Sequence, residues 1–310
     1  MGPPASQPTY ARLVMELTND EVAAITEVVA AAGRQALQWF RPSTRGSRSP
    51  FPGTAGVYAG AGESQAPLLV ENKQIGTVDF DPVTEADRAV ETVLRDAIRS
   101  MFPGDAITGE EFGAEGSGRR RWLIDPVDGT RAFIAGQPMW GTLVGLMVDR
   151  VPIAGWMHLP VLDETYVGLG DRAHLSLPVS RPVPAPGPRD TVSVATASTT
   201  ELADAVLLCT HPSMFAPGRE WERFAVLAST VKMTRYGGDC MNYGLVASGD
   251  ADLVVENQLA VHDIVPLIPI ISGAGGVVTD LDGNTPIEGG FVVAAATPEL
   301  HRAALDVLNG

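Results

Sequence analysis

Cysteine is scarce in this sequence. Only Cys209 and Cys240 occur among 310 residues, and neither belongs to a CxxC pair. We therefore expect reduced thiols and a cytoplasmic setting. Long apolar runs are also missing: none approaches the roughly 20 residues of a membrane span, and the N-terminus lacks the basic start and apolar core of a secretory signal. The sequence predicts a protein without a membrane segment.

Basic residues are outnumbered, with 22 Lys and Arg against 37 Asp and Glu and a formal net charge of -15. Nucleic acids and anionic membranes need clustered Lys and Arg, so we expect neither as a partner. A phosphorylated substrate is not excluded, because bound divalent cations can reverse the local field. An acid-rich chain is expected to handle phosphate through metal.

The first part of the chain predicts two helices separated by a long loop. Thr18 and Glu21 form a capping-box pattern in a helix over 18–40. Residues 41–65 are rich in Pro, Ser and Gly, which predicts a flexible insertion, with a functional lid as the alternative. A second helix is expected from near Thr84.

Strand patterns follow and later alternate with helices, which predicts an α/β fold. The strand-like runs are RRWLID, WGTLVGLMVD, VPIAGWMHLP, ETYVGLG, TVSVAT, AVLLCT, DLVVE, GGVVTD and FVVAA. The helical stretches of the second half lie around 219–230, 239–248, 263–273 and 297–308. The Pro-rich segment 181–190 is the candidate boundary between an α+β domain over 1–185 and an α/β domain over 186–310.

The segment WLIDPVDGT places Asp125 and Asp128 just beyond an apolar strand. Two carboxylates at this spacing can converge on a hard cation such as Mg²⁺ if the turn folds them together. Gly129 would let a phosphate approach the backbone, with the Thr130 hydroxyl as a further donor. The alternative is an ordinary Asp-Pro, Asp-Gly turn.

Two other acidic segments are candidates for the same site. In TGEEFG, Glu110 and Glu111 are adjacent and point apart, so we expect one of them to reach the site; the alternative is a solvated acidic pair. In DPVTEAD, Asp81 is the candidate, because Thr84 and Asp87 resemble a helix cap.

A fourth acidic position, Asp263, begins a strongly apolar helix, where the helix dipole favours an anion. A helix-terminal role without chemistry is the alternative. His262 beside it is expected to form a pocket wall or to pack rather than to bind metal.

The ordered set DPVTEAD, GEE, WLIDPVDGT and a late HD before GAGG resembles the inositol monophosphatase family of metal-dependent phosphatases. The resemblance extends from about Glu71 to the C-terminus. It implies a layered α-β-α-β-α sandwich, of the type also found in fructose-1,6-bisphosphatase, and a homodimer. It also implies a requirement for Mg²⁺, two to three ions per site, with Mn²⁺ as a substitute, and frequent inhibition by lithium.

The resemblance assigns metal ligands to both predicted domains. Glu110, Asp125 and the backbone carbonyl of Val127 would bind the first ion. Asp125, Asp128 and Asp263 would bind the second, with Asp125 as the bridge, and a weaker third ion would touch Glu110 largely through water. The first domain would thus carry most ligands, and the second would supply Asp263 and the substrate-binding residues.

The resemblance also implies catalytic roles. Asp81 and Thr130 match the pair that activates the attacking water on the first ion, and Glu110 is the third expected catalytic residue. Gly129 and Thr130 would donate to phosphate. Lys73 corresponds to a basic residue near the metal site, although the insertion before it weakens this alignment.

Within the family, the runs RYGGDC, LVVE and LIPII followed by GAGG look closest to histidinol-phosphate phosphatases. Inositol phosphatases typically carry a small neutral residue where Asp239 stands. An extra carboxylate suits histidinol phosphate, which has an ammonium and an imidazole group; a helix N-cap role for Asp239 is the alternative, and both can coexist. The expected substrate-binding residues are Asp128, Arg235, Asp239, Cys240, Glu256 and Asp263.

Two departures from the family pattern keep other functions open. His262 stands where Trp or Tyr is common, and the 41–65 insertion is atypical. An inositol, cyclitol, sugar or nucleoside monophosphate is the alternative substrate. A regulatory protein that binds metal without catalysis is an alternative of a different class, which the presence of all four candidate carboxylates opposes.

Overall fold

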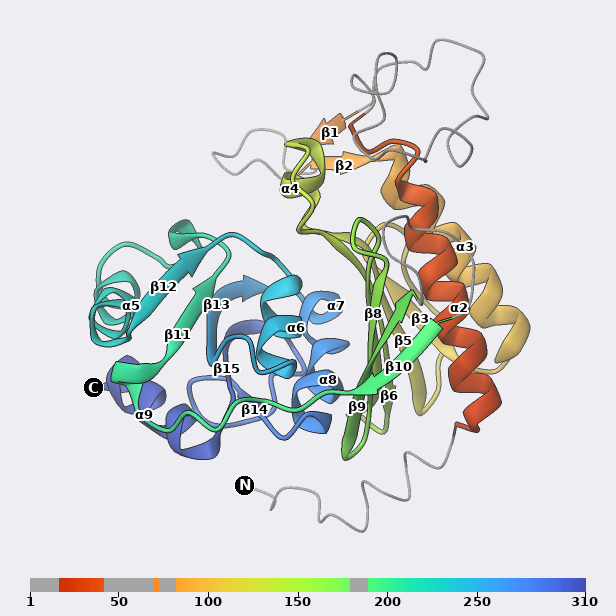
Figure 1. Cartoon of the computed structure of the whole chain (residues 1–310). Coiled ribbons are helices and arrows are strands. Elements are labelled where there is room, and N and C mark those ends of the chain that lie inside the picture. Colours follow the sequence, from red (N-terminus) through yellow and green to blue (C-terminus); the bar gives the residue numbers. More distant parts are fainter. Residues whose placement is uncertain (1–16, 42–69, 73–81, 179–188) are drawn as a thin grey trace.

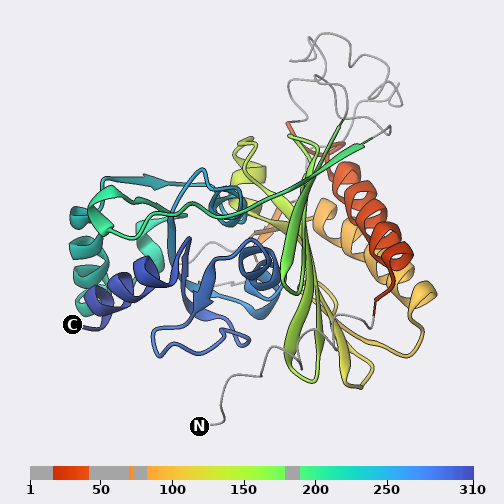
Figure 2. The same cartoon turned by 60° about the horizontal axis from the view of Figure 1, so that its bottom comes forward.

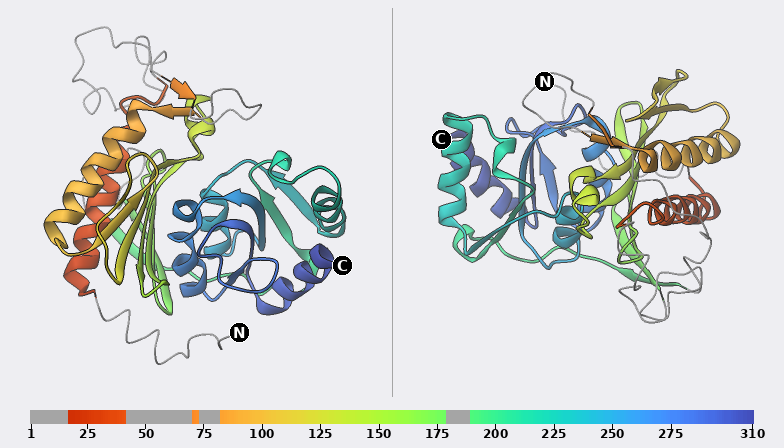
Figure 3. Two further views of the ribbon diagram at one scale, coloured as in Figure 1. Left: turned by 180° about the vertical axis from the view of Figure 1, so that it is seen from behind. Right: turned by 90° about the horizontal axis from the view of Figure 1, so that it is seen from above.

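The computed structural model describes residues 17–41, 70–72, 82–178 and 189–310. These residues form five layers in the order helices, sheet, helices, sheet, helices (Figure 1). The same layers are visible from other sides in Figures 2 and 3. This arrangement is the α-β-α-β-α sandwich expected from the sequence.

The first helical layer contains α2 (Asn19–Ala36) and α3 (Glu85–Met101), which pack against each other on the outer face of the first sheet. α2 begins at the predicted capping box: the Thr18 hydroxyl accepts from the Glu21 N–H at 3.2 Å, and the Glu21 carboxylate accepts from the Thr18 N–H at 2.7 Å. α3 begins directly after Thr84. Both predicted helices are confirmed.

The first sheet has eight strands in the order β10-β9-β8-β7-β6-β5-β3-β4. Their bounds are β3 Ala106–Gly109, β4 Gly113–Glu115, β5 Arg120–Asp128, β6 Gly141–Val148, β7 Val151–Leu159, β8 Glu164–Leu169, β9 Arg172–Pro178 and β10 Arg189–Ser193. β5 to β10 pair antiparallel, whereas β3 runs parallel to β5. The carboxyl ends of β3 and β5 therefore meet at one edge of the sheet, where the short helix α4 (Thr130–Ile134) follows.

The second sheet has the order β12-β11-β13-β15-β14. Its strands are β11 Val206–Cys209, β12 Met233–Tyr236, β13 Leu253–Leu259, β14 Val277–Thr279 and β15 Gly290–Ala295. β11 is parallel to both of its neighbours. The outermost helices, α5 (Arg219–Thr230) and α9 (Pro298–Asn309), pack together and cover the face of this sheet that points away from the first sheet. A separate small sheet pairs β1 (Val70–Asn72) with β2 (Pro82–Thr84).

The middle layer contains α6 (Met241–Ala247), α7 (Val261–Ile264) and α8 (Leu267–Gly273). α8 lies very close to the first sheet because two strand positions have no side chain. A Cβ atom on Gly155 would overlap the Pro266 carbonyl, and one on Gly168 would overlap the backbone of Pro269. Glycine at these positions allows the two halves of the molecule to dock.

Three large apolar clusters fill the spaces between the layers. The cluster between α2, α3 and the first sheet includes Trp122, Trp140 and Trp156. A second cluster lies between the two sheets around α6 and α8, and a third lies beneath α5 and α9.

Some sequence expectations need correction or remain untested. The helix expected over 263–273 is split into α7 and α8, because Pro266 interrupts backbone hydrogen bonding there. Strands β1 to β4, β9 and β12 and the short helix α4 were not expected. Residues 42–65 of the predicted insertion lie outside the described residues, as does most of the Pro-rich segment, so the domain boundary stays a prediction.

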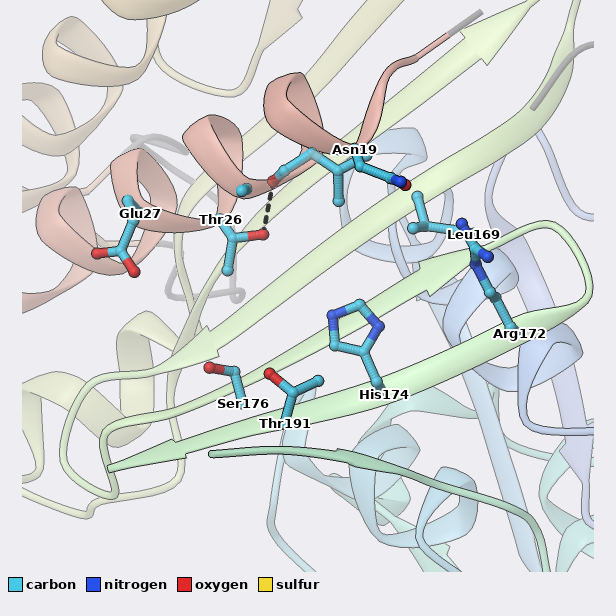
Figure 4. Close-up of a pocket in the computed structure, with 10 residues that line it drawn as sticks. Asn19, Thr26, Glu27, Leu169, Arg172, His174, Ser176 and Thr191 are labelled. Atoms are coloured by element: carbon cyan, nitrogen blue, oxygen red, sulfur yellow. Dashed lines mark hydrogen bonds between the residues drawn. The ribbon is translucent and has the colours of Figure 1, made fainter. Parts of the chain in front are cut away.

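A cavity of about 430 Å³ lies between α2 and strands β8 to β10 (Figure 4). Arg172, His174 and Ser176 line it from β9, and Asn19 and Glu27 line it from α2. None of the residues that line it belongs to the acidic motifs. In the described part of the chain, no helix is long and apolar enough to cross a membrane.

Candidate active site

Asp125 and Asp128 lie at the carboxyl end of β5 and face the same region. In the pairing with β6, Asp125 is opposite Leu143 and Asp128 is opposite Gly141, so β5 contains one extra residue at this point. Residues three apart on a regular strand point to opposite faces, but a bulge of one residue restores a common face. The ligand atoms of Asp125, Asp128 and Asp263 all lie within 4.8 Å of one another.

The bulge is held by hydrogen bonds from side chains. Oδ1 of Asp125 accepts from the Val127 N–H at 3.1 Å, and the Thr130 hydroxyl donates to the Val127 carbonyl at 3.0 Å. The hydroxyl of the buried Thr142 donates to the Pro126 carbonyl at 2.8 Å. These bonds fix the segment that carries both carboxylates.

Glu110 reaches the same site from β3. Its N–H donates to the Ile124 carbonyl at 3.1 Å, which continues the parallel pairing of β3 with β5. The ligand atoms of Glu110, Asp125 and His262 form one group within 4.8 Å, and those of Glu110, Glu111 and Asp87 form another. Glu110 is the member of the Glu pair that groups with Asp125.

Asp263 enters from α7, in the second half of the chain. Its Oδ2 accepts from the Ala260 N–H at 2.8 Å, and its Oδ1 is 3.3 Å from Nε2 of His262. The helix-terminal role and the position beside Asp125 therefore coexist. His262, expected only as a wall residue, also lies within reach of the Glu110 and Asp125 carboxylates.

The electrostatics of this carboxylate cluster fit divalent cations. Burial raises the pKa of Asp125 well above its ordinary value, and the negative charges of Glu110 and Asp128 raise it further. Burial, followed by the charges of Asp239 and Asp263, does the same to the pKa of Asp128. Cations bound among buried carboxylates cancel their mutual repulsion and stabilise their ionised form. An all-oxygen donor set of this kind suits Mg²⁺.

Asp239 lies directly against the turn after Asp128. Gly129 has φ 84°, and a Cβ atom added to it would be 3.0 Å from Cγ of Asp239. Burial, followed by the negative charge of Glu256, raises the pKa of Asp239 to about 7, and the positive charge of Arg131 opposes this rise. Arg131 was missed by the sequence reasoning, although a basic residue directly after Gly129 and Thr130 was a usable signal. α6 begins after Cys240 without a side-chain cap, so Asp239 is not its N-cap.

Glu256 is buried near Asp239, and both of its carboxylate oxygens accept hydrogen bonds. One carboxylate oxygen accepts from the backbone N–H and the hydroxyl of Thr210 at 2.9 and 2.7 Å and from the Asn242 amide at 3.3 Å. The other accepts from the Tyr243 hydroxyl at 3.1 Å. Burial raises the pKa of Glu256, and these donors oppose the rise.

The remaining predicted residues differ in placement. Cys240 is buried, and its backbone N–H donates to Asp128 at 2.7 Å. Arg235 is exposed on the edge strand β12. Asp81 and Lys73 lie outside the described residues.

Comparison with known proteins gives this site its context. Residues 58–309 match the profile of the inositol monophosphatase family. The chain belongs to this family.

Individual relatives support the assignment. The chain is 37% identical over 233 residues to the histidinol-phosphatase of Mycobacterium tuberculosis, which covers 74% of this chain and 86% of the relative. It is 35% identical over 244 residues to the chloroplastic bifunctional phosphatase IMPL2 of Arabidopsis thaliana; this match covers 74% of the chain and spans 66% of the plant protein's length. The solved inositol monophosphatase of Zymomonas mobilis superposes with a TM-score of 0.71 at 30% identity, over 94% of this chain and 98% of the other.

Membership of the inositol monophosphatase family confirms the resemblance and the fold expected from the motifs. The chain is thereby a phosphatase of this family, and its acidic clusters are consistent with metal sites.

Proposed function

We propose that this phosphatase hydrolyses L-histidinol phosphate to L-histidinol and phosphate in a reaction that requires Mg²⁺. One observation carries the proposal: Asp239 lies against Gly129, directly beside the cluster of Asp125, Asp128 and Asp263. The cluster suits the phosphate end of the substrate through cations, and the additional carboxylate suits a positively charged organic end.

The proposed metal ligands are those implied by the resemblance to the family, and the grouping of the carboxylate oxygens supports them. Glu110, Asp125 and the Val127 carbonyl would hold one ion, and Asp125, Asp128 and Asp263 would hold a second. A third ion would contact Glu110 largely through water, and Mn²⁺ would replace Mg²⁺. When bound, the cations supply positive charge that cancels the repulsion around a phosphate dianion and promotes loss of a proton from water.

The residues of the chain itself orient the reactants. Gly129 has no side chain, so a phosphate can approach its N–H, with the backbone N–H of Thr130 as a second donor. Asp81 and Thr130 would orient the attacking water, and the Asp81 carboxylate would receive its proton; Glu110 is the third residue to which we assign a catalytic role. The Thr130 hydroxyl is already oriented by its bond to the Val127 carbonyl.

The organic end of the substrate is assigned to Asp239 and Glu256, with Cys240 and Arg235 nearby in the chain. In the part of the chain that the structure describes, no donor to the Asp239 carboxylate is found, whereas Glu256 accepts from three side chains and one N–H. Asp239 is therefore the direct partner for an ammonium or imidazolium group. Glu256 contributes a negative charge in a fixed position.

The test is a comparison of phosphate release from histidinol phosphate, inositol monophosphate and AMP, each with Mg²⁺ and with EDTA. We expect release to require Mg²⁺ and kcat/KM to be highest for histidinol phosphate. A higher kcat/KM for either of the other esters would assign the site to an inositol, cyclitol, sugar or nucleoside phosphate. Metal binding without release from any ester would indicate a regulatory role. The homodimer remains a prediction, which the mass in solution would test.

A further inference from the structure

A buried ion pair on α3 contacts the loop that carries Glu110. Glu91 and Arg95 are 0% and 2% exposed, and Nε of Arg95 lies 2.7 Å from Oε1 of Glu91. Arg95 also donates to the carbonyl of Gly113 and lies 3.2 Å from Oε2 of Glu115. The pair is thus tied to β4, at the end of the loop that follows Glu110.

The Glu91 carboxylate accepts hydrogen bonds from two backbone N–H groups of this loop. It accepts from the Glu111 N–H at 2.7 Å and from the Phe112 N–H at 3.3 Å. A Cβ atom on Gly109 would overlap Oε1 of Glu91, so the chain passes directly against the carboxylate before Glu110 as well as after it. Glu91 therefore contacts the residues on both sides of Glu110.

Glu110 itself is anchored on the opposite side. Its N–H donates to the Ile124 carbonyl, one residue before Asp125. With Glu91 on one side and β5 on the other, the backbone of Glu110 is fixed, and its carboxylate lies within 4.8 Å of the Asp125 carboxylate. Replacing a buried ion pair by apolar residues is often neutral or stabilising, so stability alone is a weak reason for this pair.

We propose that Glu91, held by Arg95, is a positioning residue for the metal ligand Glu110. It does not bind the ion; it sets the loop so that the Glu110 carboxylate is in place before the ion arrives. Loss of a group that hydrogen-bonds to a metal ligand typically changes metal affinity about 10- to 100-fold, and Glu91, which acts through the backbone next to Glu110, is expected at the lower end of this range. The inference rests on the metal site proposed above.

The test measures metal affinity without turnover, by titration of the metal-free protein with Mn²⁺ in a calorimeter. Glu91→Gln keeps the size of the side chain but replaces one acceptor oxygen by a donor that faces N–H groups. We expect its Kd for Mn²⁺ to rise about tenfold. Arg95→Lys, which keeps the charge but cannot hold both Glu91 and Gly113, should raise Kd less and in the same direction.

Asp105→Asn is the matched control. Asp105 is a mostly buried carboxylate that pairs with Arg120 at 2.9 Å and accepts from Nε1 of Trp122, at the other end of β3 from Glu110. Its loss should lower the unfolding temperature and leave the Kd for Mn²⁺ unchanged.

The outcomes separate this inference from the proposed function. If the unmodified protein binds no Mn²⁺, the proposed metal site itself fails. If the unmodified protein binds Mn²⁺ and folded Glu91→Gln binds it equally well, the positioning role of Glu91 is overturned. Should Glu91→Gln not fold, native affinity in folded Arg95→Lys would overturn it instead.

Discussion

The backbone N–H of Cys240 donates a hydrogen bond of 2.7 Å to Oδ2 of Asp128, across 112 positions of sequence. Asp128 belongs to the first sheet, and Cys240 directly follows Asp239 at the start of α6. This bond ties the carboxylate cluster to the residues assigned to the organic part of the substrate. It fixes the separation between the two groups of residues that we propose to bind the two ends of the substrate.

Asp125→Asn should lower kcat at least about a thousandfold while the fold survives, because the bridging ligand of the proposed metal pair is lost. The metal-free variant should be no less heat-stable than the parent, since one of several repelling buried carboxylates has been neutralised. Steady-state kinetics and thermal unfolding in EDTA measure the two effects. Activity close to that of the parent would refute the metal assignment.

Metal should stabilise the protein most at neutral or higher pH. The pKa values of Asp125, Asp128 and Asp263 are raised in the folded, metal-free chain, so this state binds protons more tightly than the unfolded chain does. The free energy of unfolding without metal therefore falls as pH rises from the ordinary carboxyl range through these raised values.

Mg²⁺ at about 100 times its Kd should restore about 2.7 kcal/mol at pH 7.5, and less at pH 5.5 where protons compete for the ligands. Thermal unfolding with Mg²⁺ and with EDTA at the two pH values measures the difference. Equal stabilisation at both would contradict the prediction, and Asp125→Asn should lose most of the effect.

Asp239→Ala should lower kcat/KM for histidinol phosphate about 10- to 100-fold, the range expected when a hydrogen bond to a charged group is lost. Hydrolysis of the phosphate of a neutral alcohol should fall much less. Parallel assays of the two esters provide the measurement. Equal losses would remove Asp239 from recognition of the substrate.

The KM for histidinol phosphate should fall as pH rises from 6 to 8. Burial raises the pKa of Asp239 to about 7, so its carboxylate gains the negative charge that attracts the substrate cation within this window. The ester of a neutral alcohol provides the reference profile. In Asp239→Asn the pH profiles of KM for the two esters should no longer differ. If they still differ, another group binds the charged part of the substrate.

Replacement of both Cys209 and Cys240 by Ser should leave kcat within about threefold of the parent, because the proposed chemistry needs no thiolate. Burial raises the pKa of both thiols, and the Asp128 carboxylate raises that of Cys240 further, so neither ionises near neutral pH. Phosphate release by the double variant is the measurement. Inactivation with an intact fold would point to thiol chemistry.

The sequence predicted most helices and most strands because their apolar spacing and caps are local. The convergence of the proposed metal ligands on one site was harder to predict from the sequence. The side chains of Asp125 and Asp128 share a face through a bulge, and Glu110 joins them through parallel pairing of β3 with β5; both are properties of strand register. A signal for Glu91 was present: Asp87, Glu91 and Arg95 recur every fourth residue on the buried face of α3, where apolar residues are expected.

The absence of side chains at Gly155 and Gly168 affects the geometry of the proposed metal site. These glycines let α8 rest on the first sheet, and α8 continues from the helix that presents Asp263, whereas Asp125 belongs to the sheet itself. A single methyl group at either glycine would overlap the backbone of Pro266 or Pro269 and push the two halves of the molecule apart. We expect the distance between the Asp125 and Asp263 carboxylates to increase as a result. Gly155 and Gly168, which lie outside the proposed site, thus determine the distance between the two carboxylates proposed to share an ion.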